Sequence, residues 1–307
     1  MKKVILTGGA GFVGSAVIKE LLQNDVKVWA VVRPGFSSRL SMSRLAGLPI
    51  NYVECDLKDL RNLPAMLEER DFDVWYQFAW DGLFGEELTD YHKQAANIVY
   101  MMNAITAAAF TRCRKFVGAG SVSQYELFMP ADKNQEGDKH RVYKAAKMSC
   151  QYLGAGAAAS QNIEFIWPII TNIYGAGEKS PRLINSMIRK LQNKEHQALS
   201  RGDQFYDFIY ITDAAKAFRL IGEHGRENRN YIIAQGMAGP LRDFLNVVKD
   251  VVDPEAELGF GELAFNGYYL PKECYDITQL AEDTGFVPEI TFEEGIRLTS
   301  DWIRSGK

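Results

Sequence analysis

The sequence is poor in the residues that cross-link small secreted domains or bind metal ions. It has 4 cysteines and 4 histidines among 307 residues. The cysteines form no C-x-x-C pair, which argues against a disulfide framework or a zinc site and favours a reducing cytoplasm. The histidines show no metal-ligand spacing, so we expect no bound metal. The cysteines are Cys55, Cys113, Cys150 and Cys274.

Long hydrophobic runs and an excess of one charge are also missing. No stretch approaches the ~20 apolar residues of a transmembrane helix. The apolar run Val4–Leu6, which follows two lysines, is too short for the core of a secretory signal. Lysine and arginine number 35 against 39 aspartate and glutamate, a net charge of -4. This balance predicts neither nucleic acid nor an anionic membrane as a partner.

The sequence does have short apolar segments that alternate with helix-length segments. Such alternation is typical of a parallel sheet with helices on both faces, each strand separated from the next by a helix. After about Tyr174 the rhythm loosens, which predicts a smaller second lobe. The predicted strands are Lys3–Leu6, Val26–Val32, Ile50–Glu54, Val74–Phe78, Lys115–Ala119, Ile163–Trp167 and Asn230–Ala234. The predicted helices are Phe12–Gln23, Ala95–Phe110, Ala145–Ser160, Pro181–Asn193, Thr212–Glu223 and Pro240–Val252.

A glycine-rich segment, TGGAGFVG from Thr7 to Gly14, follows the first predicted strand and opens the first predicted helix. Its glycines permit a tight turn and let backbone N–H groups approach a pyrophosphate, and the helix N-terminus adds partial positive charge. In this context the segment predicts a dinucleotide site. The predicted fold class is therefore α/β, a Rossmann-type doubly wound parallel sheet with a smaller C-terminal α/β lobe. Residues 1–170 should form the dinucleotide-binding domain, to which parts of 205–235 return, and residues 171–307 should mainly bind substrate.

The ends of the second and third predicted strands bear on the choice of dinucleotide. An acidic residue after the second strand would bind the ribose 2′-hydroxyl of NAD. The chain instead has Arg33, whose guanidinium could meet the 2′-phosphate of NADP, although a solvated surface arginine is the alternative. We therefore expect NADP, with NAD possible. After the third strand, Asp56 could accept a hydrogen bond from the adenine amino group or cap the helix that begins at Lys58.

Three residues form a candidate catalytic group. Tyr143 and Lys147 lie four residues apart on a predicted helix, hence on one face, although such a pair also occurs by chance on surfaces. A nearby ammonium favours the phenolate, so the phenol can act as general acid or base on an alcohol or ketone. Ser121 follows a predicted strand at the sheet edge where α/β proteins bind ligands, and it could donate to the same substrate oxygen. Ser123 is a weaker candidate for that role.

Together these features resemble the extended short-chain dehydrogenase/reductase family. Within it, the chain looks like the NAD-dependent epimerase/dehydratase group, which acts on nucleotide sugars. Three further segments extend the resemblance over nearly the whole chain. Pro168–Gly175 is similar to the group's P-x-x-x-N-x-Y-G, Asp207–Asp213 to its R-D-F-I-Y-V-x-D, and Asp276–Pro288 to its C-terminal motif. The resemblance implies a homodimer formed through Ala95–Phe110 and Ala145–Ser160.

The resemblance also implies roles for single residues. Asn97 would support the active site, Asn172 would lie near the sugar diphosphate, and Phe78-Ala79-Trp80 replaces the usual L-A-A beside the adenosine ribose. The implied cofactor-binding residues are Thr7, Gly8, Gly11, Phe12, Val13, Gly14, Arg33, Asp56, Leu57, Phe78, Ala79, Trp80, Asn97, Tyr143, Lys147 and Pro168. The implied substrate-binding residues are Ser123, Asn172, Lys179, Arg182 and Tyr206.

The chain also departs from this group's pattern. Dehydratases of the group carry Asp-Glu directly after the catalytic serine or threonine, where this chain has Val122 and Ser123, so a 4,6-dehydratase would lack its acid and base. Tyr206 replaces a phosphate-binding arginine, and a second expected arginine is missing. Lys179, Arg182 and Arg201 could bind the diphosphate instead.

These departures favour one function over its alternatives. A 4-epimerase must retain NAD+ and anchor the diphosphate while the sugar rotates, whereas a reductase uses NADPH once and releases it. We therefore expect a reductase of a nucleotide-linked 4-keto sugar, with a nucleotide-sugar 4-epimerase as the alternative. Two further alternatives are a reductase of a small non-nucleotide carbonyl compound and a non-catalytic dinucleotide-binding regulator. The intact Ser121, Tyr143 and Lys147 argue against the regulator.

Overall fold

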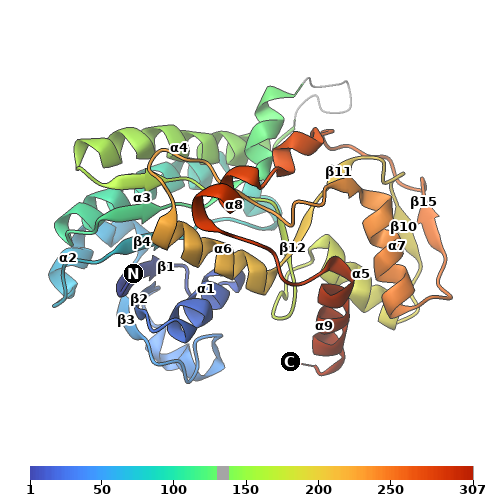
Figure 1. Cartoon of the computed structure of the whole chain (residues 1–307), viewed down its shortest axis with the longest axis horizontal. Coiled ribbons are helices and arrows are strands. Elements are labelled where there is room, and N and C mark those ends of the chain that lie inside the picture. The colour runs from blue at the N-terminus through green and yellow to red at the C-terminus, as the bar shows by residue number, and fades with distance from the viewer. Residues whose placement is uncertain (130–137, 307) are drawn as a thin grey trace.

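The computed structural model describes residues 1–129 and 138–306, and its centre is a six-stranded parallel sheet (Figure 1). The strand order is β3-β2-β1-β4-β5-β7, which is the order of a doubly wound dinucleotide-binding fold with β7 in the sixth place. The predicted fold class is thus confirmed. The strands are β1 (Lys3–Thr7), β2 (Lys27–Val32), β3 (Asn51–Glu54), β4 (Val74–Gln77), β5 (Lys115–Val117) and β7 (Glu164–Ile166).

Helices cover both faces of this sheet (Figure 1). Along β1, Val4 and Leu6 belong to one buried apolar cluster and Ile5 to the other, as the alternation of side chains along a strand requires. On the face of Val4 and Leu6, α1 packs against α6, and on the opposite face α3 packs against α4. These helices are α1 (Phe12–Gln23), α3 (Tyr91–Phe110), α4 (Arg141–Ser160) and α6 (Ile211–His224).

The connection from β2 to β3 differs from the prediction of a helix between successive strands. It contains only a 3-10 helix, η1 (Ser37–Met42), followed by turns. Gly35 and Gly47 both adopt left-handed backbone conformations, with φ of 77° and 73°. Such residues end a right-handed helix, so the segment remains a compact loop beside the dinucleotide site.

The predicted strand Lys115–Ala119 is also shorter than expected. It ends at Val117, and the chain then enters a second, three-stranded sheet. Gly118 and Gly120 lie against the indole of Trp167, so closely that a Cβ at either position would overlap the ring. This step brings Ser121 to the sheet edge. The second sheet has the order β13-β8-β6 and consists of β6 (Gly120–Ser121), β8 (Ile169–Ile170) and β13 (Ile232–Ile233).

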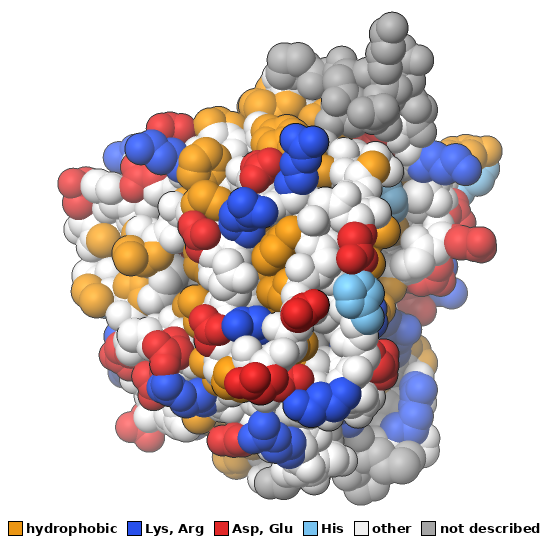
Figure 2. Space-filling model, turned by 90° about the vertical axis from the view of Figure 1, so that its right-hand side faces the viewer, with side chains coloured by type: hydrophobic (Ala, Val, Ile, Leu, Met, Phe, Trp, Pro, Cys, Tyr) orange, Lys and Arg blue, Asp and Glu red, His pale blue; other side chains and the backbone are white. Residues whose placement is uncertain are grey.

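A smaller lobe occupies the right-hand side of Figure 1. Next to it, β9 pairs with β12 and β11 with β14, each as a separate two-stranded sheet. Its outer face carries lysine and arginine interspersed with aspartate and glutamate (Figure 2). The strands of these segments are β9 (Asn172–Tyr174), β10 (Gln197–Leu199), β11 (Phe205–Tyr206), β12 (Phe208–Tyr210), β14 (Gly239–Pro240) and β15 (Leu258–Phe260). The helices of the smaller lobe are α5 (Leu183–Gln192), α7 (Leu241–Val252) and α9 (Phe292–Arg304), whereas α8 (Thr278–Thr284) packs against α6 and β13.

Five short helices complete the description. They are α2 (Leu63–Met66) and the 3-10 helices η2 (Leu57–Asn62), η3 (Gly85–Thr89), η4 (Val122–Phe128) and η6 (Lys272–Tyr275). In the part of the chain that the structure describes, no helix has the length and apolar character needed to span a bilayer.

Candidate active site

The glycine-rich loop between β1 and α1 forms a cradle of bare backbone. Gly8 has φ of 74°, and a Cβ there would lie 2.6 Å from the backbone nitrogen of Ala79. A Cβ on Gly14 would run into the carbonyl oxygen of Gly8. Gly11, which precedes α1, has no side chain that could cap the first N–H groups of the helix. These features fit the pyrophosphate of a dinucleotide.

The loop after β2 closes around a carboxylate that the sequence did not single out. Glu54, at the end of β3, accepts hydrogen bonds from the backbone nitrogens of Gly35 (2.7 Å) and Ser37 (2.8 Å) and from the Ser37 hydroxyl. These bonds, led by the one from the Ser37 side chain, hold the pKa of Glu54 below its usual value. Arg33 lies exposed at the start of this loop.

A second arginine approaches the glycine-rich loop from the same connection. The guanidinium of Arg44 donates to the carbonyl oxygens of Ala10 (3.2 Å) and Gly177 (2.8 Å). It therefore joins the dinucleotide cradle to the loop that follows β9. Nothing in the sequence marks Arg44, because its two partners lie 34 and 133 residues away along the chain.

At the end of β3, Asp56 caps the following turn. Its carboxylate accepts a hydrogen bond from the backbone nitrogen of Lys58 (3.1 Å) at the start of η2. The capping role considered from the sequence is therefore observed, and a contact with adenine stays a prediction. Leu57 is half-buried and packs against the apolar cluster under α3 and α4.

The segment after β4 is held from two sides. The Thr7 hydroxyl accepts a hydrogen bond from the Ala79 nitrogen (3.2 Å). From α3, the Asn97 side chain accepts from the Asp81 nitrogen and donates to the Asp81 carbonyl oxygen, each at 2.8 Å. Phe78 turns into the core, where its ring meets Phe218 edge-on at 4.7 Å between centroids. Asn97 thus holds the loop that follows β4, and its role in supporting the active site stays a prediction.

Ser121 and Tyr143 meet at the edge of the second sheet. The Ser121 Oγ lies 2.8 Å from the Ser123 Oγ and accepts a hydrogen bond from the Ser123 nitrogen (3.3 Å). Burial raises the pKa of Tyr143, while a hydrogen bond with Ser121 and the positive charge of Arg182 lower it. The phenol is therefore protonated at neutral pH but sits where a positive charge can assist its ionisation.

Lys147 lies one helical turn further along α4 and is buried. Its Nζ donates to the carbonyl oxygen of Ala119 (2.7 Å) and lies 3.6 Å from the centroid of the Trp80 ring. Burial lowers the pKa of Lys147 to about 7. Pro168 is buried below this group, where its carbonyl oxygen accepts from the Gly120 nitrogen (2.8 Å).

The predicted substrate residues occupy the adjoining segments of the smaller lobe. Asn172 is half-buried and donates to the Asp207 carbonyl oxygen (3.0 Å). Tyr206 stacks on Phe208, and burial, followed by the nearby Glu126 carboxylate, raises the pKa of its phenol. Negative charge next to Tyr206 makes this position a poor place for a phosphate.

Positive charge instead gathers on the loop that leads into α5. Arg182 is about half exposed, and its Nε lies 3.5 Å from the buried carboxylate of Glu178. Its effect on the pKa of Tyr143 places it near the catalytic group. Lys179 is exposed on the same loop. The structure therefore brings Arg182 towards Tyr143 and leaves Lys179 at the surface.

One buried ion cluster beside Tyr143 was missed by the sequence analysis. Lys144 is paired at 2.6 Å with Glu126 and at 2.6 Å with Asp138, and its Nζ lies 4.4 Å from the centroid of the Tyr268 ring. The cluster ties the start of α4 to η4 and to the C-terminal segment. The sequence around Lys144 gives no sign of this ion cluster, because the partners of Lys144 come from three separate segments.

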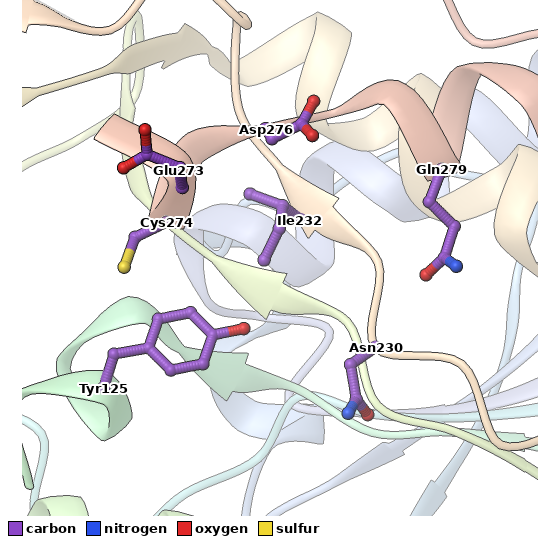
Figure 3. Close-up of a pocket in the computed structure, with 7 residues that line it drawn as sticks. All are labelled: Tyr125, Asn230, Ile232, Glu273, Cys274, Asp276 and Gln279. Atoms are coloured by element: carbon purple, nitrogen blue, oxygen red, sulfur yellow. The ribbon is translucent and has the colours of Figure 1, made fainter. Parts of the chain in front are cut away.

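A further pocket is shown in Figure 3. Its lining combines a tyrosine ring, two amides and two carboxylates around Ile232, and none of the predicted site residues is among them. The Asp276 carboxylate is engaged in a turn with the backbone of Thr278 (2.9 Å). The lining residues are Tyr125, Asn230, Ile232, Glu273, Cys274, Asp276 and Gln279.

A glycine-rich dinucleotide-binding loop, together with a serine, a tyrosine and a lysine at the sheet edge, is typical of enzymes of the short-chain dehydrogenase/reductase class. Residues 4–234 match the model of the NAD dependent epimerase/dehydratase family. The chain belongs to this family, and the family predicted from sequence is confirmed.

Known proteins resemble the chain over almost its full length. A protein of Methanocaldococcus jannaschii, provisionally named UDP-glucose 4-epimerase, is 24% identical, with 98% of each chain covered. The structure of UDP-glucose 4-epimerase from Thermotoga maritima with UDP-glucose has a TM-score of 0.80 at 18% identity, with 99% of each chain covered. The Bordetella bronchiseptica enzyme WbmF in complex with NADH has a TM-score of 0.77 at 19% identity, covering 99% of this chain and 92% of the other.

Proposed function

We propose that the chain is a cytoplasmic, NADPH-dependent reductase that converts the C4 ketone of a nucleotide-linked sugar to an alcohol. The observation that carries this proposal is the gathering of Ser121, Tyr143 and Lys147 beside the glycine-rich cradle. The names of the relatives, which refer to UDP-glucose and to 4-epimerases, support a nucleotide sugar as the substrate class and C4 as the reacting carbon.

The chemistry follows from the three side chains. When bound, the dinucleotide supplies the hydride. Tyr143, whose raised pKa keeps the phenol protonated, donates a proton to the ketone oxygen. Ser121 donates a hydrogen bond to the same oxygen and stabilises its developing negative charge. Lys147 stabilises the tyrosinate left after the transfer and holds the nicotinamide ribose.

The substrate diphosphate is proposed to lie towards the loop of Lys179 and Arg182, with Asn172 and Ser123 closer to the sugar. Tyr206 takes the place of an arginine, and its neighbour Glu126 carries the wrong charge for a phosphate. Arg182, which is about half exposed and close to Tyr143, is the cation best placed to meet the diphosphate. In this arrangement residues 171–307 mainly bind substrate, while 1–170 and parts of 205–235 bind the dinucleotide.

The NADP preference is proposed from Arg33. The side chain is exposed at the end of β2, on the loop that would face the 2′-phosphate. A charged hydrogen bond there is worth roughly 1.5 to 3 kcal/mol. Calorimetry should therefore show at least tenfold tighter binding of NADPH than of NADH, and Arg33→Ala should remove the difference. Equal affinities for the two dinucleotides in the wild-type protein would refute the preference.

The decisive assay is incubation of the purified protein with NADPH and a panel of UDP-, CDP-, GDP- and dTDP-linked 4-keto-6-deoxy sugars. We expect NADPH consumption with one nucleotide class and no stoichiometric NAD+ in the purified protein. The second candidate is a nucleotide-sugar 4-epimerase, which the names of the relatives favour. One tightly bound NAD+ per chain, with C4 inversion of a UDP-sugar and no added cofactor, would reverse the assignment.

A homodimer through α3 and α4 is proposed as the working form. The two helices pack together, and each carries large apolar side chains that are more than half exposed. On α3 these include Val99 (56% exposed) and Phe110 (67%), and on α4 they are Tyr152 (67%) and Leu153 (53%). Exposed apolar side chains on neighbouring helices are typical of a surface that is covered by a partner.

A further inference from the structure

In the segment Phe78-Ala79-Trp80, a tryptophan takes the place of the last alanine of the family pattern L-A-A. Trp80 is therefore the largest change in side-chain size within this segment. The side chain is only 8% exposed. Its ring centroid lies 3.6 Å from the Lys147 Nζ, and its ring meets that of Tyr143 edge-on at 5.8 Å between centroids. One indole therefore contacts two of the three residues of the catalytic group.

The indole is fixed in this position from α3. Its Nε1–H donates to the Gln94 Oε1 at 2.9 Å. The Gln94 amide is itself held, because its nitrogen donates to the carbonyl oxygens of Gly82 (2.8 Å) and Glu87 (3.0 Å). Gln94 is buried, so a change of indole rotamer would leave a buried acceptor without its donor.

Lys147 has neutral neighbours in place of a carboxylate partner. In the described structure, the titratable groups that face it are Tyr143 and Cys150, both on α4. The segment after β4 contributes the Trp80 ring, and the connection from β5 to β6 contributes the Ala119 carbonyl oxygen. The face of an indole attracts a cation, and the attraction is largest where water is excluded.

We propose that Trp80 is a positioning residue of the active site, whose indole face favours the charged form of the buried Lys147 and fixes it beside Tyr143. The proposal rests on the proposed function only in giving Lys147 a place in the catalytic group. A small side chain at position 80 would leave the ammonium with the Ala119 carbonyl as its sole strong contact among the groups described above. The chain would then hold a neutral amine over most of the physiological pH range.

The ionisation of Lys147 can be followed directly by NMR titration of protein carrying 13C-labelled lysine. Lys147→Arg identifies the resonance. In Trp80→Leu the pKa of Lys147 should fall by about one unit, and in Trp80→Phe, which keeps an aromatic face, by less than half of that. Trp302→Leu, a change in α9 far along the chain, should leave the value unaltered.

Two outcomes would overturn the proposal. One is a Lys147 pKa in Trp80→Leu that equals the wild-type value, and the other is an equal fall in the leucine and phenylalanine variants. If the leucine variant does not fold, Gln94→Leu replaces it, because this change releases the indole without removing it. Gln94→Leu should then lower the Lys147 pKa in the same direction, and an unchanged value would again refute the role of Trp80.

A second readout separates positioning from a loss of packing. If Lys147 must be charged to bind the dinucleotide, a one-unit fall in its pKa from about 7 weakens NADPH binding by about tenfold at pH 8.5 and about twofold at pH 6. Damage to packing alone would weaken binding equally at both pH values and would contradict the proposal. Neither measurement uses a sugar. If both results are as expected but the protein reduces no nucleotide-linked ketone, only the proposed function is refuted and the role of Trp80 stands.

Discussion

Replacement of Gly14 by alanine should remove dinucleotide binding while leaving the protein folded. Gly14 lies in the first turn of α1, and its Cα faces the turn that Gly8 makes after β1. An added Cβ would overlap the Gly8 carbonyl oxygen and approach the Gly9 Cα to 3.0 Å. Since these are backbone atoms, the overlap can be relieved only by moving the start of α1 away from the loop.

The size of the effect follows from what that movement separates. Overpacking by one methyl group typically costs 1–3 kcal/mol of stability, so we expect a folded protein with a lower melting temperature, roughly 2–4 °C per kcal/mol. Displacing the N-terminus of α1 also removes its N–H groups from the pyrophosphate. Losing two charged hydrogen bonds of roughly 1.5–3 kcal/mol each reduces affinity by about a hundredfold or more.

Fluorescence titration with NADPH and a thermal melt test both parts of this prediction. Gly156→Ala is the matched control, because Gly156 is also helical, on α4, and a Cβ there would meet nothing within 4 Å. The control should bind NADPH as the wild type does, because Gly156 lies on α4, outside the glycine-rich loop. A Gly14→Ala protein that binds NADPH within threefold of the wild type would show that the cradle does not hold the pyrophosphate.

Four further outcomes are expected. Tyr143→Phe should retain NADPH affinity and lose roughly 10²- to 10⁴-fold in turnover, and a rate above a tenth of wild type would exclude it as the acid. Since the folded-state pKa of Lys147 is lowered to about 7, kcat/KM for ketone reduction should fall as the pH rises through about 7, and a flat profile from pH 6 to 9 would contradict this. Asp207→Asn should destabilise the fold by about 1–3 kcal/mol in urea unfolding, because the carboxylate accepts from the nitrogens of Gln235 and Met237 and an amide offers one acceptor oxygen. Leu153→Glu should give a monomer by light scattering at micromolar concentration, and a persistent dimer would place the interface elsewhere.

The parts of the fold that the sequence predicted are those specified by neighbouring residues. The helix Phe12–Gln23 was predicted with its observed bounds, because the glycines before it and its own apolar spacing fix where it begins and ends. The parallel sheet was predicted because strands buried on both faces are apolar throughout. The break in Lys115–Ala119 was not, because it depends on Trp167, about 50 residues later, whose ring occupies the space beside Gly118.

The candidate site shows the same division. Ser121, Tyr143 and Lys147 were singled out because the spacing within α4 and the position after a strand are local signals, and their catalytic role stays a prediction. The partners that tune them are not local. Lys147 meets Trp80 across 67 residues of chain, and Glu54 reaches back to the loop of Gly35. Neither a tryptophan after β4 nor a glutamate at the end of β3 has a sequence signature for these contacts, since each depends on which strands become neighbours in the sheet.

The order of the strands also connects the two halves of the site. β1 and β4 are neighbours, so the loops that follow them touch: the Thr7 hydroxyl holds the Ala79 nitrogen, and Gly8 has no room for a side chain beside it. The next residue, Trp80, faces Lys147. The proposed cradle for the pyrophosphate and the ammonium of the proposed catalytic group are therefore linked through Ala79 and Trp80. A change that shifts the Gly8 turn should consequently move the indole of Trp80 as well. The same stretch of backbone would then determine both the shape of the glycine-rich loop and the ionisation of Lys147.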